Sequence, residues 1–168
     1  ANNAYKEAVK FGDIHVVFSS KDRNFDRVPT QAELDIRPDA DYFYICANNT
    51  IYGTEYQYDP ETPAGVPLVA DMSSNILSKP VDVSKYGVIY AGAQKNMGPA
   101  GVTVVIVRED LLGSYPLEKY PVMLDWQTMA NKGSMYNTPP TYGIYVLGLV
   151  LEWVEQMGGV KVMQERAE

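Results

Sequence analysis

The sequence contains three short, nearly continuous apolar runs. They cover residues 66–70 ("VPLVA"), residues 88–93 ("VIYAGA") and the β-branched segment of residues 102–108. Runs of this kind are typical of strands that lie in a sheet covered on both faces. Because connecting segments separate the runs, the sequence predicts an α/β fold, with a mostly parallel sheet and helices on both faces.

Two earlier segments also have the character of strands. They are residues 14–20 ("IHVVFSS") and residues 41–50 ("DYFYICANNT"), and the second ends in the polar residues Asn49 and Thr50. A helical pattern opens the chain and stops at Gly12, and a turn of helix is expected near residues 31–34. We therefore expect five strands in all.

A long helix is predicted near the C-terminal end, in "NTPPTYGIYVLGLVLEWVEQMGG". Thr138 is the expected N-cap, because its hydroxyl can accept a hydrogen bond from a free backbone N–H of the first turn. Pro139 and Pro140 are expected in that first turn, where proline is tolerated. Gly158 and Gly159 are expected to end the helix.

Composition and charge argue against several kinds of partner. The 168 residues suffice for one domain with a core, but they carry a net charge of -7 and no run of Lys or Arg. We therefore expect no nucleic-acid partner and no membrane partner. The longest apolar run is too short to cross a bilayer, and no signal peptide is visible. One cysteine, Cys46, excludes an internal disulfide and suits a reducing compartment, so we expect a cytoplasmic protein.

Polar residues follow three of the predicted strands at the point where each strand ends. Thr50 follows the strand of residues 41–50, Asp71 follows residues 66–70, and Gln94 and Lys95 follow residues 88–93. Ligands of α/β sheets collect at the carboxyl ends of the strands. Taken singly, Asp71 is equally typical of a helix cap or a turn, and Lys95 of a turn exposed to solvent. Taken together, they predict a ligand site.

An acid and an amine at neighbouring strand ends fit one cofactor in particular. Pyridoxal phosphate needs an amine to hold its aldehyde and an acidic residue on its ring nitrogen. Asp71 and Lys95 would approach opposite edges of the flat ring from neighbouring strands. A lysine buried in such a site would also be placed to move a proton at the substrate. The pattern alone also allows an unrelated α/β binding module.

Three blocks of the sequence resemble one family. The longest is "DMSSNILSKPVDVSKYGVIYAGAQKNMGPAGVTVVIVREDLLG", at residues 71–113, and the others are "CANNTIYGTEY" and "MYNTPPTYGIYVLGLVLEWVEQMGG", at residues 46–56 and 135–159. They resemble, in the same order, the phosphoserine aminotransferases, a pyridoxal-phosphate-dependent family of fold type I. The resemblance covers nearly the whole chain and implies that it is the central part of the large domain of such a transferase.

The resemblance implies roles for six residues. Lys95 matches the Schiff-base lysine, and Asp71 matches the partner of the pyridine nitrogen. Gln94 matches a residue that contacts the cofactor phosphate, and Thr50 matches a threonine near the hydroxyl and phosphate side of the ring. Asn137 and Thr138 match residues that reach the cofactor phosphate of the other subunit in a homodimer. Asn49 stands where many members of the family carry Glu. No metal site is implied.

The reaction that the resemblance implies is a transamination of serine biosynthesis. Glutamate donates an amino group to 3-phosphohydroxypyruvate, giving O-phosphoserine and 2-oxoglutarate. Residues 1–168 match only part of the large, cofactor-binding domain, and the N-terminal segment and C-terminal small domain of the family are expected to be absent. We therefore expect the chain alone to be inactive or nearly so. The alternative is a non-catalytic, truncated member of the family that acts as a binding or dimerisation domain.

Overall fold

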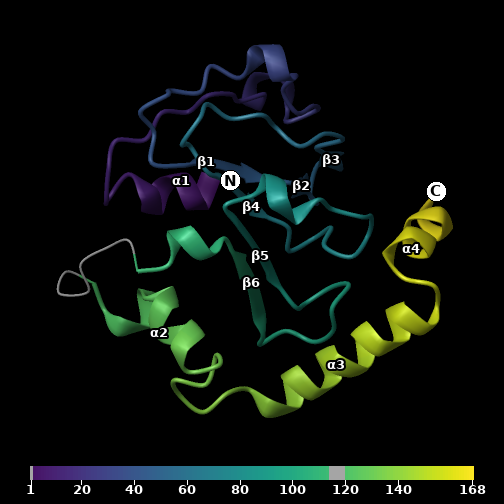
Figure 1. Cartoon of the computed structure of the whole chain (residues 1–168). Helices are drawn as coiled ribbons and strands as arrows, with labels where there is room; N and C mark the ends of the chain where they lie inside the picture. Colours follow the sequence, from purple (N-terminus) through teal and green to yellow (C-terminus); the bar gives the residue numbers. More distant parts are fainter. Residues whose placement is uncertain (1, 114–119) are drawn as a thin grey trace.

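A four-stranded sheet forms the centre of the computed structural model, which describes residues 2–113 and 120–168 (Figure 1). The strands are β1 (Phe43–Cys46), β4 (Leu68–Asp71), β5 (Val88–Gly92) and β6 (Thr103–Val107), and this is also their order across the sheet. The first three are parallel, and β6 is antiparallel to β5. A small antiparallel hairpin, β2 (Asn48–Asn49) and β3 (Thr54–Glu55), follows β1. The predicted α/β fold with a mostly parallel sheet is confirmed.

The helices are mostly short. They are α1 (Asn2–Ala8), α2 (Trp126–Asn131), α3 (Thr141–Gln156) and α4 (Val160–Ala167). Single 3₁₀ turns lie between them: η1 (Lys21–Arg23), η2 (Gln31–Glu33), η3 (Val83–Lys85), η4 (Glu109–Leu111) and η6 (Val122–Leu124). Among these, η2 confirms the turn of helix expected near residues 31–34. Within the part of the chain that the structure describes, no helix combines the length and the apolar character that crossing a membrane requires.

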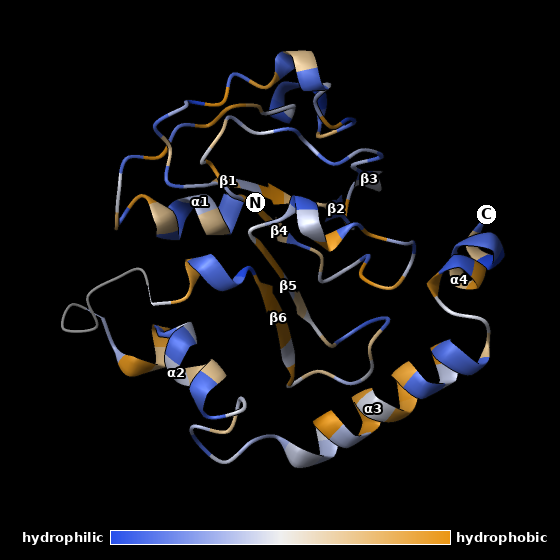
Figure 2. Ribbon diagram, in the orientation of Figure 1, coloured by the Kyte–Doolittle hydropathy of each residue, from blue (hydrophilic) through white to orange (hydrophobic). Residues whose placement is uncertain are grey.

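The two faces of the sheet differ in character. One face carries the main core, in which Phe43, Ile45, Leu68, Ala70 and Ile89 are buried together. Figure 2 shows how strongly apolar residues dominate the strands of the sheet. Side chains alternate along a strand, so the residues between the core residues point to the other face. This other face carries the half-buried polar side chains of Tyr44, Cys46, Asp71 and Tyr90 beside the apolar Val69 and Val88, and we call it the polar face.

The strand expected at residues 14–20 is absent from the structure, so this prediction was wrong. The segment is held by side-chain contacts instead of a strand ladder. Val17 packs against the core, the Arg27 guanidinium lies 4.7 Å from the ring centre of Phe18, and the Ser20 hydroxyl donates to the carbonyl of Arg27. An apolar pattern shows that a segment is packed, but a strand also needs a neighbour with free backbone groups.

Helix α3 begins two residues later than predicted, and Thr138 is not its N-cap. Pro140 occupies the N-cap position, and no side chain caps the helix there. Each proline restricts the residue before it to extended backbone, which keeps residues 138 and 139 out of the helix. At the other end the prediction was right, because Gly158 has a φ of +103° and follows the last helical turn.

Helix α3 packs closely onto the loop between β5 and β6. A Cβ at Gly143 would lie only 2.9 Å from Val102, and a Cβ at Gly98 would lie 3.8 Å from Val146 and Val150 of the helix. The opposite side of α3 exposes large apolar side chains, among them Tyr145, Leu149 and Trp153. Small residues thus bring the helix close to the loop that follows the candidate site.

Candidate functional site

The side chain of Lys95 contacts Thr50 across the candidate site. Lys95 Nζ donates a hydrogen bond of 2.8 Å to Thr50 Oγ1. Lys95 lies three residues beyond β5, whereas Thr50 follows β2 in the hairpin after β1. Since β4 lies between β1 and β5, this hydrogen bond joins segments on either side of the carboxyl end of β4. Asp71 is the last residue of that strand.

Lys95 is exposed in this structure. Thr50 is exposed as well. An ammonium group open to water and bonded to a hydroxyl avoids the large cost of burying an unpaired charge. The amine is nevertheless directed at one specific partner that lies 45 residues away in sequence.

Asp71 is half-buried on the polar face and is held by the turn that follows it. The backbone N–H of Ser73 donates to Asp71 Oδ1 over 2.9 Å. One carboxylate oxygen of Asp71 therefore stabilises the turn, as the alternative interpretation of this residue predicts. Register places Cys46 of β1 and Tyr90 of β5 beside Asp71, so the three side chains share one face of the sheet.

Two serines after Asp71 tie together the segments that carry the site. The backbone N–H of Gly92, at the end of β5, donates to Ser73 Oγ over 3.1 Å. The Ser74 hydroxyl donates to the carbonyl of Asn48, in β2, over 3.0 Å. These bonds connect the turn after β4 with the segments that lead to Lys95 and to Thr50.

The charges of Asp71 and Lys95 both affect the pKa of the Cys46 thiol. Burial raises the pKa of its thiol, the Asp71 carboxylate raises it further, and the Lys95 ammonium lowers it. Cys46 thus lies close enough to both groups for their charges to act on one atom. The thiol donates to the carbonyl of Asn48 over 3.4 Å. The Asp71 carboxylate and the Lys95 ammonium therefore both affect Cys46, which ends β1 at the carboxyl end of the sheet.

The remaining expected site residues are not brought into this cluster. Gln94 is exposed beside Lys95, and its backbone N–H donates to the carbonyl of Gly92. Asn137 and Thr138 are exposed ahead of α3, and Asn137 Nδ2 contacts the sulfur of Met123 over 3.1 Å. Among the described residues, no hydrogen bond joins Asn137 or Thr138 to Lys95.

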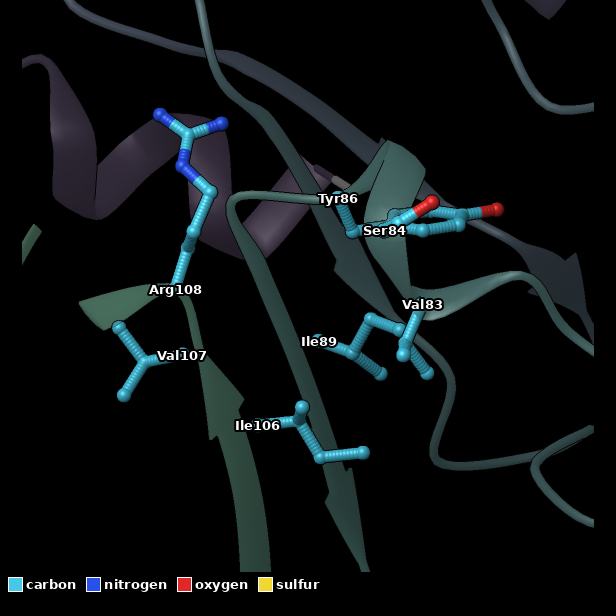
Figure 3. A pocket seen from close by; sticks show the side chains of 7 residues that line it. All are labelled: Val83, Ser84, Tyr86, Ile89, Ile106, Val107 and Arg108. Atoms are coloured by element: carbon cyan, nitrogen blue, oxygen red, sulfur yellow. The ribbon is translucent and has the colours of Figure 1, made fainter. Parts of the chain in front are cut away.

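Two hollows in the surface lie away from these residues. One, of about 220 Å³, lies beside β5 and β6, and Figure 3 shows Ile89, Ile106 and Val83 around it, while the guanidinium of Arg108 points away. The other, of about 250 Å³, lies beside the hairpin and is lined by Tyr56, Asp59, Asn75 and Lys79 among others. Neither of these two hollows includes Lys95, Asp71 or Thr50.

Sequence reasoning missed the tyrosines of the polar face. Tyr44 and Tyr90 read as members of apolar strands, yet their hydroxyl oxygens lie 3.2 Å apart. The available signal was the alternation of side chains along a strand. It places Tyr44 on the same face as Cys46, and it places Tyr90 on the same face as Asp71 when β4 and β5 run parallel in the observed register. Strand register, which decides the contact, is not visible in the sequence.

Known proteins resemble this chain along its whole length. The model of the class-V aminotransferase family matches residues 1–168. The phosphoserine aminotransferase of Nitrosomonas europaea is 51% identical over 97% of the chain and 46% of its own length. That of Geobacillus kaustophilus is 54% identical over 99% of the chain and 45% of its own length. The chain therefore spans about half the length of these curated relatives.

Solved structures agree with this comparison. The phosphoserine aminotransferase of Bacillus circulans subsp. alkalophilus superimposes with a TM-score of 0.93 at 45% identity, over 98% of this chain and 45% of its own. A phosphoserine aminotransferase studied for radiation damage of its Schiff base gives a TM-score of 0.94 at 46% identity, with the same coverage. With its sequence and its fold in agreement, the chain belongs to the class-V aminotransferase family.

Proposed function

We propose that this chain is part of the cofactor-binding domain of a phosphoserine aminotransferase. The enzyme would transfer the amino group of glutamate to 3-phosphohydroxypyruvate, giving O-phosphoserine and 2-oxoglutarate in serine biosynthesis. The observation that carries the proposal is the placement of Lys95 and Thr50 around the strand end that bears Asp71. The names of the relatives support the same activity.

The donor set at this edge fits pyridoxal phosphate. When bound, this cofactor supplies a ring that accepts the electron pair left at the substrate α-carbon. Lys95 would supply the amine that holds the aldehyde, and the Asp71 carboxylate would accept a hydrogen bond from the protonated ring nitrogen. The two groups extend from segments after neighbouring parallel strands, as a flat ring between them requires.

The residues of the chain have distinct tasks in this proposal. Lys95 Nζ would hold the cofactor and would serve as the base that moves the proton at the substrate α-carbon. Thr50 Oγ1 orients Nζ through the hydrogen bond that the structure contains. Asp71 would keep the ring nitrogen protonated, and one of its carboxylate oxygens accepts from the N–H of Ser73. Gln94, beside Lys95, would contact the cofactor phosphate.

The proposal includes a homodimer in a cytoplasmic setting. Asn137 and Thr138 would reach the cofactor phosphate of the other subunit, since both are exposed and are not bonded to Lys95 among the described residues. The exposed apolar side chains of α3, such as Tyr145 and Trp153, support a partner surface nearby. The free thiol of Cys46 is consistent with a reducing compartment.

A second candidate is a non-catalytic member of the family. Residues 1–168 would then act as a binding or dimerisation domain. In either case we propose that they form part of the large domain, with the N-terminal segment and small domain of the family lying outside them.

Cofactor binding and turnover are tested separately. Mixing the chain with pyridoxal phosphate should give a visible absorption band that Lys95→Ala abolishes and that Lys161→Ala, at an exposed position in α4, leaves intact. Reduction with borohydride followed by peptide mapping should place the cofactor on Lys95. Binding without transamination of phosphoserine would favour the second candidate. A label spread evenly over surface lysines would contradict both.

A further inference from the structure

Two tyrosines form a bridge across the polar face of the sheet. Tyr44 belongs to β1 and Tyr90 to β5, and their hydroxyl oxygens lie 3.2 Å apart. Strand β4 lies between β1 and β5, so the joined hydroxyls must meet over β4. This is the strand that ends in Asp71. Both tyrosines are half-buried, which is consistent with a fixed contact between them.

Strand register brings the bridge to Asp71. The Cα of Tyr90 is the register partner of the Cα of Asp71, and the strands are parallel, so the two side chains leave the sheet on the same face. Tyr44 is aligned with Val69, two residues before Asp71, which again places it on this face. Both tyrosine side chains therefore share a face of the sheet with the carboxylate that the proposed function assigns to the ring nitrogen.

The surroundings of the pair keep both hydroxyls protonated. Burial raises the pKa of Tyr44, and its hydrogen bond to Tyr90 raises it further. Burial also raises the pKa of Tyr90, and the negative charge of Asp71 adds to that shift. Either hydroxyl can donate in the bond between them. Both phenols thus stay neutral and able to donate at neutral pH.

We propose that Tyr90, supported by Tyr44, is a positioning residue that fixes the Asp71 carboxylate for the ring nitrogen of the cofactor. The inference rests on the proposed function. One carboxylate oxygen of Asp71 already accepts from the N–H of Ser73, which belongs to the same turn. Tyr90 is aligned with Asp71 on the next strand, and its side chain lies on the same face of the sheet. The Ser73 hydrogen bond and a tyrosine ring packed beside the carboxylate would together restrain the side-chain rotation that would turn the carboxylate away from a ligand at the strand end.

The test compares two ligands that differ at a single ring atom. One is pyridoxal phosphate, and the other is its analogue with a C–H group in place of the ring nitrogen, which offers Asp71 no hydrogen bond. Tyr90→Phe should weaken binding of pyridoxal phosphate about tenfold and change binding of the analogue less than about twofold. Tyr44→Phe should show the same selectivity at about threefold. Absorbance titration of the chain measures both ligands.

The matched control is Tyr86→Phe. Tyr86 is a buried tyrosine whose hydroxyl donates to the Asp59 carboxylate, on the other side of the sheet from the polar face. Its loss should affect the two ligands equally. A double-mutant cycle completes the design: in an Asp71→Asn background, Tyr90→Phe should cause no further selective loss, because the positioned group is absent.

Three outcomes separate the two proposals. An equal loss for both ligands in Tyr90→Phe and Tyr44→Phe would mean that the bridge only stabilises the fold, which overturns this inference and leaves the proposed function standing. No Lys95-dependent band with pyridoxal phosphate in the unsubstituted chain would overturn the proposed function, and this inference with it. A selective loss in Tyr44→Phe, which keeps Tyr90, supports the inference even if Tyr90→Phe does not fold.

Discussion

Lys95 and Thr50 are 45 residues apart in sequence, yet their side chains meet over 2.8 Å at the carboxyl end of the sheet. The strand order makes this contact informative. A parallel β1–β4–β5 arrangement places the segments after β1 and β5 on the two sides of the residue that ends β4. An amine, a hydroxyl and a carboxylate are thereby gathered at one edge, although no two of them are neighbours in the chain.

The first prediction concerns Thr50 as the residue that orients the Lys95 amine. Thr50→Val keeps the shape of the side chain but removes the oxygen that accepts from Nζ, so the rate at which pyridoxal phosphate is trapped on Lys95 should fall about three- to tenfold. Thr50→Ser, which keeps the hydroxyl, should retain most of that rate. Stopped-flow absorbance measures the reaction. Equal rates for the Val and Ser variants would show that the contact does not orient the amine.

The second prediction concerns the serines that tie the site together. Ser74→Ala removes the hydrogen bond to the Asn48 carbonyl, and Ser73→Ala leaves the Gly92 N–H without its acceptor. Each should lower the free energy of unfolding by about 1 kcal/mol and also weaken cofactor binding, because the segments leading to Thr50 and Lys95 lose their connection to Asp71.

Ser78→Ala is the control for the serine variants. The Ser78 hydroxyl donates to the carbonyl of Asn75 within a single turn, so its loss removes a comparable bond that connects no other strand. Urea unfolding should show a similar loss of stability, with cofactor affinity unchanged. If Ser78→Ala weakened cofactor binding as much as Ser74→Ala, stability alone would explain the effect.

The third prediction concerns acid stability. The side-chain hydrogen bond from Arg27, together with bonds from Thr30, lowers the pKa of Glu33 from 4.5 to about 2. A carboxyl group whose pKa is lower in the folded state stabilises that state above pH 4.5, and the contribution is lost as the pH falls toward 2. Glu33→Gln should therefore flatten the fall in unfolding free energy over this range, measured by urea titration. Because Glu33 is exposed, the effect should shrink in high salt.

Two strands were predictable because their side chains are buried. Residues 66–70 and 88–93 were expected as strands, and the structure has β4 (Leu68–Asp71) and β5 (Val88–Gly92). Leu68, Ala70 and Ile89 belong to the core, which is why an apolar run marks these segments. Residues 14–20 carry a similar pattern without becoming a strand, because strand formation also depends on a hydrogen-bonding partner elsewhere in the chain.

The site was predictable only to the level of strand ends. The expectation that Thr50, Asp71 and Lys95 lie near one another follows from parallel topology, and the structure places them at one edge. The exposure of Lys95 and the Tyr44–Tyr90 contact depend on register and on packing between distant segments. Neither register nor packing between distant segments can be derived from local sequence. Residue types therefore suggested the chemistry of the site but not the contacts that support it.

The last prediction concerns two glycines in the same helix, α3. A Cβ at Gly143 would lie 2.9 Å from Val102 Cγ2, whereas a Cβ at Gly148 would meet nothing within 4 Å. Gly143→Ala should therefore push α3 away from the loop that follows Lys95 and destabilise the protein by about 1–3 kcal/mol. Gly148→Ala should stabilise it by about 0.5–1 kcal/mol, because alanine favours a helix interior more than glycine does.

Chemical unfolding followed by circular dichroism distinguishes these two alanine variants, since both add one methyl group to one helix and differ only in what the methyl group meets. A second measurement asks whether the packing of α3 matters for the site. Gly143→Ala should weaken cofactor binding as the loop of residues 96–102 shifts, and Gly148→Ala should not. Equal stability for the two variants would contradict the close packing of α3 against Val102 and, with it, the coupling of this helix to the turn that carries Lys95.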